Sequence, residues 1–193
     1  FLTFFHLSIC CVNKSIIIRL LVKLDAVAND KIYLVGFMAA GKTTAAKAIG
    51  AHLDWTVTDL DAHIELHMRQ TVSEIFTTHG EEYFRAAENR FLRELLPHRN
   101  TVIATGGGTF VSKENRELMN HDGVSVWIDV SLNTVRQRLL PDDTRPLAAE
   151  RDSMARLYAA RRRAYNDAHL HLKADRMTTD ELVGHIVAYL DQI

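Results

Sequence analysis

The chain has 193 residues, of which 47% are apolar and 24% charged, with a formal net charge of −1 at pH 7. This length suits one globular domain with a sizeable core. The near-neutral balance excludes a broadly basic surface, so we expect no nucleic-acid and no membrane partner. The two cysteines, Cys10 and Cys11, are adjacent and suit neither a disulfide framework nor a metal site. We therefore expect a reducing, cytoplasmic compartment.

Residues 1–30 differ in composition from the rest of the chain. No Asp or Glu occurs from Phe1 to Leu24, and the apolar run Phe1–Val12 is too short to span a bilayer as a helix. That run also lacks the preceding basic segment of a secretory signal. We interpret residues 1–30 as an N-terminal extension that reflects a mis-set start, a fragment or an organelle transit peptide. A transit peptide would make the location organellar. The predicted domain is 31–193.

The strongest motif follows a predicted buried strand, Lys31–Val35. Gly36-x-x-x-x-Gly41-Lys42-Thr43 comes next, and then an Ala-rich stretch with high helix propensity. Strand, glycine loop and helix in this order is the context of a P-loop, which we favour over a plain glycine turn. Backbone N–H groups and the helix N-terminus would bind phosphate, Lys42 would neutralise it, and Thr43 would ligate Mg²⁺. The predicted ATP-binding residues here are Gly36, Ala39, Ala40, Gly41, Lys42, Thr43 and Thr44.

Two carboxylates, Asp59 and Asp61, follow the second predicted strand, Trp55–Thr58. Ligands of a parallel sheet gather at the carboxyl ends of its strands. The pair therefore suggests Mg²⁺ and proton chemistry beside the P-loop. A surface turn with an Asp helix cap is the alternative.

The next helical stretches carry two spaced pairs of side chains. His63 and His67 share a face of the predicted helix Ala62–Arg69, but the order His-Ile-Glu-Leu-His favours a solvated face over a zinc site. Arg85 and Glu88 stand at i,i+3 on the following helix. Their ion pair could aim the guanidinium at a carboxylate, or it could be an ordinary surface pair.

The remaining pattern completes an α/β fold. The strand Thr101–Ala104 leads into three glycines, which bring bare backbone close to another group. A polar stretch at about 141–152 interrupts the periodicity and resembles a mobile lid carrying basic residues. The other predicted elements are strands Val124–Val130 and His169–Lys173, and helices that start after Ser112, Ser131, Ser153 and Thr178. We predict a three-layer α/β/α fold with a five-stranded parallel sheet, in the P-loop NTPase group.

Taken together, these motifs resemble shikimate kinase, a member of the nucleoside-monophosphate-kinase-like P-loop group. The resemblance runs from Lys31 to Ile193. It rests on the series formed by the P-loop, Asp-x-Asp, Gly-Glu-x-x-Phe-Arg-x-x-Glu, Ala-Thr-Gly-Gly-Gly, Arg-Pro-Leu and an Arg four residues before a Tyr. It implies ATP-dependent phosphorylation of shikimate to shikimate 3-phosphate, with Mg²⁺, by a monomer.

The resemblance also implies roles for individual residues. Asp59 would help to hold Mg²⁺ through water, and Asp61 would bind the shikimate hydroxyls and act as the base. Lys42, Arg145 and Mg²⁺ would supply positive charge. Because the attacking hydroxyl needs only positioning and a late proton transfer, Asp61 needs no raised pKa. The implied substrate-binding residues are Asp61, Phe76, Phe84, Arg85, Glu88, Gly106, Gly107, Gly108 and Arg161, where the two arginines would grip the carboxylate and Glu88 would brace them. Arg145 would reach the transferring phosphoryl group and Arg138 would stack on adenine.

One departure and two alternatives remain open. The family usually has Pro between the Arg and Tyr of its last motif, but the chain reads Arg161-Arg162-Arg163-Ala-Tyr165. The sequence does not decide which of the three arginines contacts substrate. A related small-molecule kinase such as gluconate kinase would not need an arginine pair around a cyclic carboxylate. A non-catalytic nucleotide-binding regulator is the second alternative, although the P-loop lysine and both aspartates are present.

Overall fold

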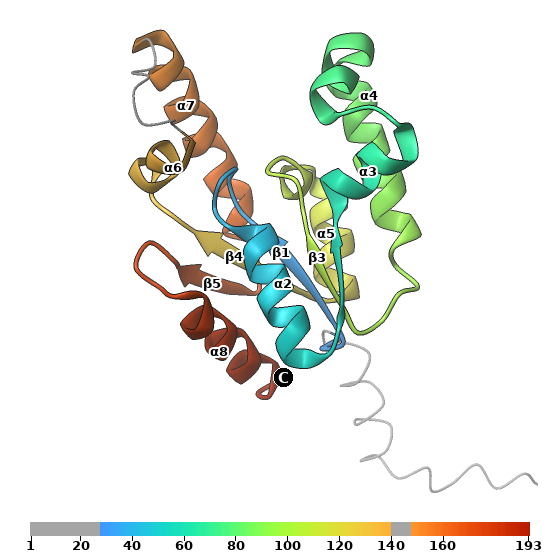
Figure 1. Ribbon diagram of the computed structural model, residues 1–193, viewed down its shortest axis with the longest axis vertical. Helices are drawn as coiled ribbons and strands as arrows, with labels where there is room; N and C mark the ends of the chain where they lie inside the picture. Colours follow the sequence, from blue (N-terminus) through green and yellow to red (C-terminus); the bar gives the residue numbers. More distant parts are fainter. Residues whose placement is uncertain (1–27, 140–147) are drawn as a thin grey trace, which may run out of the picture.

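The structure, a computed structural model, describes residues 28–139 and 148–193 (Figure 1). Most of the predicted N-terminal extension therefore lies outside the described residues. The same is true of Arg145 and of residues 141–147 of the expected lid. Within the described part of the chain, no helix is both long and apolar enough to cross a membrane.

A parallel five-stranded sheet organises the described chain, in the order β2-β3-β1-β4-β5. Each predicted strand is present, with its ends shifted by at most one residue. The first strand lies in the centre because the chain fills one side of it with β2 and β3 before it crosses to the other side (Figure 1). The strands are β1 (Lys31–Val35), β2 (Thr56–Asp59), β3 (Thr101–Ala104), β4 (Val124–Asp129) and β5 (Leu170–Lys173).

Helices cover both faces of the sheet, which confirms the three-layer prediction. The helices are α2 (Lys42–Leu53), α3 (Leu60–Met68), α4 (Val72–Glu94), α5 (Lys113–Asp122), α6 (Leu132–Leu139), α7 (Ala148–Tyr165) and α8 (Thr179–Leu190), with a 3₁₀ turn, η1 (Thr109–Val111). Helices α2 and α8 pack together on one face, whereas α5 packs against β4 on the other. Figure 1 shows α3 and α4 on one side and α6 and α7 on the other, rising above the P-loop end of the sheet.

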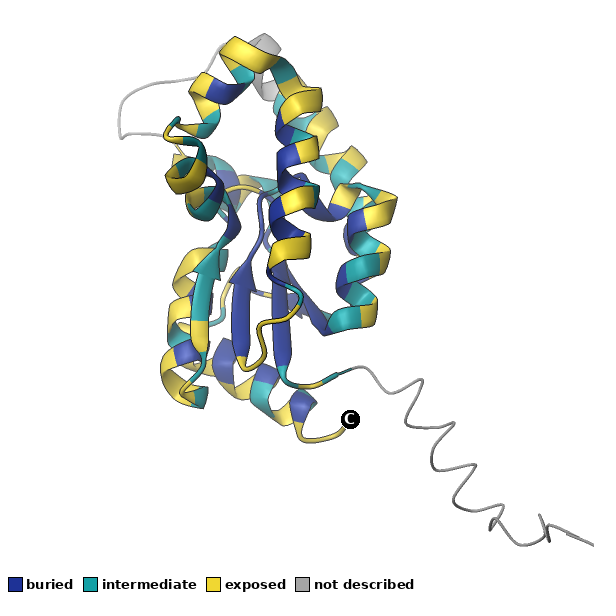
Figure 2. Cartoon of the chain, turned by 90° about the vertical axis from the view of Figure 1, so that its right-hand side faces the viewer, coloured by how far each residue is buried: buried dark blue, intermediate teal, exposed yellow. Residues whose placement is uncertain are grey.

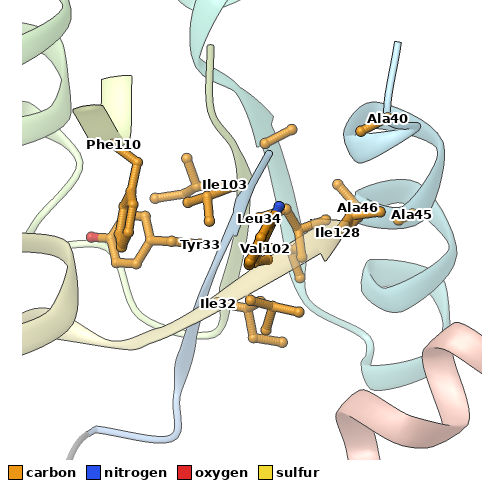
Figure 3. Packing of buried hydrophobic residues seen from close by; sticks show 14 of the residues in the cluster. Ile32, Tyr33, Leu34, Ala40, Ala45, Ala46, Val102, Ile103, Phe110 and Ile128 are labelled. Atoms are coloured by element: carbon orange, nitrogen blue, oxygen red, sulfur yellow. The ribbon is translucent and has the colours of Figure 1, made fainter. Parts of the chain in front are cut away.

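The central strands form the core because both of their faces are covered. All residues of β1 and β3 are buried, whereas the edge strands β2 and β5 are partly exposed (Figure 2). In Figure 3, Ile32 and Leu34 point toward α2 while Tyr33 points toward Phe110 of η1. This alternation is the period of a strand buried on two sides, which reads in the sequence as a continuous apolar run.

Two features of the helices differ from the sequence predictions. Helix α7 begins at Ala148 and not at Met154, so residues 148–152 of the expected lid are helical. The segment Ala-Ala-Glu-Arg consists of strong helix formers, and its polarity concealed that propensity. Helix α4 is interrupted at Gly80, where the backbone has φ 84° and ψ 173°. Glycine adopts this conformation without strain, so a second helical segment starts at Glu81.

A buried lysine stands at the start of β1, inside the run that the sequence pattern treats as apolar. Lys31 is fully buried, and its Nζ donates to the carbonyls of Leu95 and Leu96 and, at 2.7 Å, to the Asp122 carboxylate. The hydroxyl of Tyr33 donates to the same carboxylate oxygen. Arg99 donates to the other oxygen at 2.9 Å. We call Lys31, Tyr33, Arg99 and Asp122 the amino-end cluster.

Candidate active site

The P-loop has the backbone that the glycine pattern predicts. The φ angles of Gly36, Ala39 and Gly41 are 142°, 57° and 96°. A Cβ on Gly36 would lie 2.7 Å from the carbonyl oxygen of Ile128, so a side chain would not fit there. Helix α2 begins at Lys42 without a side-chain cap, which leaves its first N–H groups for a ligand.

Lys42 curls over its own loop. Its Nζ donates to the carbonyls of Gly36 at 3.0 Å and Phe37 at 2.8 Å. Burial lowers the pKa of Lys42 to about 8, although the carboxylates of Asp61 and Asp59 oppose this shift. Among the described residues, the ammonium group has carbonyl partners and no direct ion pair, and a phosphate would supply the missing charge.

Asp59 caps α3, as one of the two sequence alternatives expected, and it also contacts the P-loop. One oxygen accepts from the Ala62 N–H at 3.2 Å and caps α3, and the other accepts from the Thr43 hydroxyl at 2.6 Å. Strand β2 ends at Asp59, so the topology brings it to the P-loop. A hydroxyl and a carboxylate are the hard oxygen ligands that Mg²⁺ prefers, and this donor pair fits that ion. Within the described ranges, no group of three or more His, Cys, Asp and Glu side chains gathers around a metal position.

Asp61 holds a buried oxygen that no described residue pairs with. Within residues 28–139 and 148–193, its Oδ1 makes no hydrogen bond. Burial raises the pKa of Asp61 to about 6, with further contributions from Glu88 and Asp59 and an opposing one from Lys42. The sequence argument did not require this shift, which arises mainly from burial and secondarily from the carboxylates of Glu88 and Asp59. An unpaired buried carboxylate beside a P-loop is suited to receive a ligand hydroxyl.

The three glycines after β3 fit closely against charged side chains. A Cβ on Gly106 would lie 2.6 Å from Asp61 Oδ1 and 2.8 Å from Glu88 Oε1, and one on Gly108 would lie 2.5 Å from Arg85 Nη1. A Cβ on Gly107 would stand 3.1 Å from Arg161 Nη1. The bare backbone therefore lets all four charged side chains converge on one loop.

Arg85 and Glu88 form the ion pair that their spacing predicts, and it is not a surface pair. The Glu88 side chain is fully buried and accepts from Arg85 Nη1 and from the Thr109 hydroxyl. The rings of Phe76 and Phe84 lie 4.8 Å apart, and the Arg85 guanidinium carbon stands 5.8 Å and 5.4 Å from their centroids. A guanidinium fixed beside an aromatic wall suits a ring that carries a carboxylate.

The structure separates the three adjacent arginines. The Arg161 guanidinium lies 5.5 Å from the centroid of Phe37 and beside Gly107. Arg162 makes two bonds to Asp129, at 2.7 Å and 2.9 Å, and so ties α7 to the end of β4. Arg163 is exposed. Of the three, Arg161 faces the glycine loop, on the side where Arg85 also lies.

A cavity of about 620 Å³ joins the P-loop to Asp59, Asp61 and Gly107. Arg138 lines it and donates to the Ala39 carbonyl at 2.9 Å, so it lies over the loop as expected for a nucleotide contact. One wall was missed by the sequence reading, because its residues carry no motif. These residues are Ala174, Met177, Thr178, Thr179 and Leu182. The signal was their position directly after the carboxyl end of β5.

Comparison with known proteins identifies the family. The sequence profile described as shikimate kinase matches residues 38–191. Shikimate kinase from Sulfurihydrogenibium sp. (strain YO3AOP1) is 36% identical over 157 residues, covering 81% of this chain and 95% of the relative. Shikimate kinase from Bacillus cereus (strain G9842) is 35% identical, covering 80% of this chain and 94% of that one.

Solved structures agree with the sequence matches. Shikimate kinase from Acinetobacter baumannii in complex with shikimate has a TM-score of 0.78 at 30% identity, covering 86% of this chain and 94% of the other. Shikimate kinase from Aquifex aeolicus has a TM-score of 0.73 at 31% identity, covering 84% and 96%. The profile covers the P-loop from Met38 onward, the glycine loop and the arginines of α4 and α7, and the chain belongs to the shikimate kinase family.

Proposed function

We propose that this enzyme transfers the γ-phosphoryl group of ATP to a hydroxyl of shikimate in the space above the carboxyl ends of the strands. One observation supports this most strongly. The unpaired carboxylate of Asp61 interacts electrostatically with the P-loop lysine and with Glu88, the partner of Arg85. A phosphate donor bound by the P-loop and an alcohol whose carboxylate binds Arg85 would therefore both lie next to the Asp61 carboxylate.

The P-loop half would hold the nucleotide. The start of α2 lines the cavity and has no side-chain cap, so its first N–H groups would bind the phosphates, and Lys42 would leave its carbonyl partners for the β- and γ-phosphates. Thr43 and Asp59 would hold Mg²⁺, which supplies charge neutralisation on the phosphates when it is bound. Arg138 would contact the base, opposite the wall formed at the start of α8.

The second half would hold shikimate. Arg85 and Arg161 would bind its carboxylate, with Glu88 fixing the Arg85 guanidinium, while Phe76 and Phe84 would pack against the ring. This arrangement favours a cyclic carboxylate over gluconate, because an open-chain polyol has no flat ring to pack against the phenyl groups.

Asp61 would orient the attacking hydroxyl and accept its proton while the oxygen bonds to phosphorus and the bond to the ADP oxygen breaks. A pKa of about 6 leaves Asp61 mostly ionised at neutral pH. It also makes the carboxylate a stronger base toward the hydroxyl proton than an ordinary aspartate. Arg145, which lies outside the described residues, would add positive charge from the lid.

We also propose that 31–193 is the whole catalytic domain and that the enzyme acts as a monomer. Each proposed site residue comes from that range of a single chain.

An ATP-consumption assay with shikimate, gluconate or no acceptor tests the proposal. We expect consumption to depend on shikimate and on Mg²⁺, and the product to be a phosphate monoester of shikimate. Consumption with gluconate alone would assign the chain to another kinase activity. If the protein binds ATP but consumes none with either shikimate or gluconate, the result would contradict the proposed catalytic function.

A further inference from the structure

A second carboxylate besides Glu88 binds Arg85. Oε1 of Glu81 accepts from Arg85 Nε at 3.2 Å and from Nη2 at 3.0 Å. Glu81, Arg85 and Glu88 follow one another at i, i+4 and i+7, so they share one face of α4. The guanidinium is therefore held between two carboxylates.

The two carboxylates hold Arg85 very differently. The Glu88 side chain has 0% exposure and also receives the Thr109 hydroxyl, whereas the Glu81 side chain is 66% exposed. An exposed ion pair contributes little to stability, and its side chain reorients easily. Glu88 is thus the fixed support and Glu81 the replaceable partner.

The contact with Glu81 occupies donors that a substrate carboxylate needs. Of the five N–H donors of a guanidinium, Glu81 takes two on the Nε/Nη2 edge and Glu88 takes one on Nη1. The Nε/Nη2 edge is one of the two edges at which a guanidinium can pair with both oxygens of a carboxylate. Glu81 therefore stands where an anionic ligand would bind.

Local charge leads to the same conclusion. Arg85 and Arg161 carry two positive charges, and Glu81 and Glu88 carry two negative charges. These four groups therefore have no net charge with which to attract an anion. Glu81 also borders a cavity of about 770 Å³ that includes Gly108 and Arg161. The carboxylate has space and water beside it, and it lies directly after the helix break at Gly80.

We propose that Glu81 is a displaceable substitute for the substrate carboxylate: it occupies the Nε/Nη2 edge of Arg85 in the empty enzyme and leaves when substrate binds. The inference rests on the proposed function, because it takes Arg85 to be the carboxylate-binding residue. The exchange makes Glu81 a specificity-determining residue. A simple carboxylate must compete with Glu81 unaided, whereas shikimate adds hydroxyl contacts to Asp61.

Calorimetric titration of Glu81→Gln, Glu81→Ala and the control Glu82→Gln tests the exchange. Glu81→Gln should bind shikimate about two- to fivefold more tightly, the range of an exposed ion pair, and the gain should appear in KM for shikimate and not in kcat. Cyclohexanecarboxylate, which has the carboxylate but no hydroxyls, should gain by a similar factor, while ATP affinity stays constant. Glu81→Ala should gain at least as much as Glu81→Gln, since it leaves no side-chain acceptor on Arg85.

Glu82→Gln is the matched control, because Glu82 borders the same cavity and loses the same charge, whereas among the described residues the ion pairs of Arg85 are with Glu81 and Glu88. Weaker or unchanged shikimate binding in both Glu81 variants would overturn the inference. An equal gain in Glu82→Gln would also overturn it, since the effect would then come from the general field. Unchanged shikimate binding in Arg85→Lys would contradict the proposed function itself, which separates the two failures.

Discussion

Two groups of charged side chains lie at opposite ends of the same sheet, and they differ in how fully their polar atoms are paired. In the amino-end cluster, the Lys31 ammonium has three acceptors, and Asp122 accepts from Lys31, Tyr33 and Arg99. At the carboxyl end, Asp61 has an oxygen with no partner in the part of the chain that the structure describes. In the same part of the chain, the Lys42 ammonium has only carbonyls of its own loop as partners.

The difference indicates which end is built for stability and which for ligands. Burial lowers the pKa of Lys31 as it does that of Lys42, so a shifted pKa does not distinguish the two ends. The distinguishing feature is the unfilled bonding capacity. A buried charged group whose hydrogen-bond and ion-pair partners are all present in the protein supports the fold. A buried charged group that lacks such partners is suited to bind a substrate that supplies them.

The largest effect on stability should come from the amino end. Asp122→Ala leaves the Lys31 ammonium buried with carbonyl partners alone, so the free energy of unfolding should fall by about 3–5 kcal/mol. Denaturant unfolding measures the loss, and an assay at low temperature should show normal kcat for the molecules that remain folded. Full stability in this variant would mean that the cluster is not a structural support.

Lys42→Ala should have the opposite profile. Removal of a preorganised charge at the transferring phosphate should lower kcat by about 10²–10³-fold, while thermal unfolding stays unchanged. Steady-state kinetics and a melting curve on the same preparation measure both quantities. Near-normal turnover by a folded Lys42→Ala enzyme would remove Lys42 from the proposed site.

Arg85→Lys should affect one substrate only. Lysine keeps the charge but cannot make two parallel bonds, so shikimate binding should weaken by about 1.5–3 kcal/mol while ATP affinity hardly changes. Titration with each ligand decides the matter. Equal losses for both would show that Arg85 acts through the fold.

Deletion of residues 1–29 should have the smallest effect. The amino-end cluster begins at Lys31, and each proposed site residue follows it, so activity and thermal stability should both be nearly unchanged. A truncated protein that does not fold would contradict the proposed domain boundary and would show that the extension supports the amino end.

Much of the fold was predictable because it depends on local pattern. The strands β1, β3 and β4 are short apolar runs, and the glycines that follow β1 and β3 require special backbone or close packing. The capping box at Thr178 and the start of α8 follow from adjacent residues. These features need no knowledge of distant contacts.

Other features depend on partners far away in the chain. The burial of Lys31 is decided by Asp122, 91 residues later. The Arg162 guanidinium binds Asp129, 33 residues earlier, whereas Arg161 lies beside Gly107. The raised pKa of Asp61 depends on burial and on Glu88. No local pattern encodes these pairings, because they arise only when the sheet brings separate segments together.

The unfolding free energy of Asp61→Asn, measured against the wild type from pH 4 to pH 8, tests the central claim most directly. Because the folded-state pKa of Asp61 is raised to about 6, its contribution to stability is present below the unfolded pKa and is lost as the pH rises through about 6. The variant should therefore be inactive yet more stable than the wild type by about 3 kcal/mol at pH 8, with the gap closing near pH 4. A variant that is less stable than the wild type at pH 8 would show that Asp61 is paired and structural, and would contradict the account.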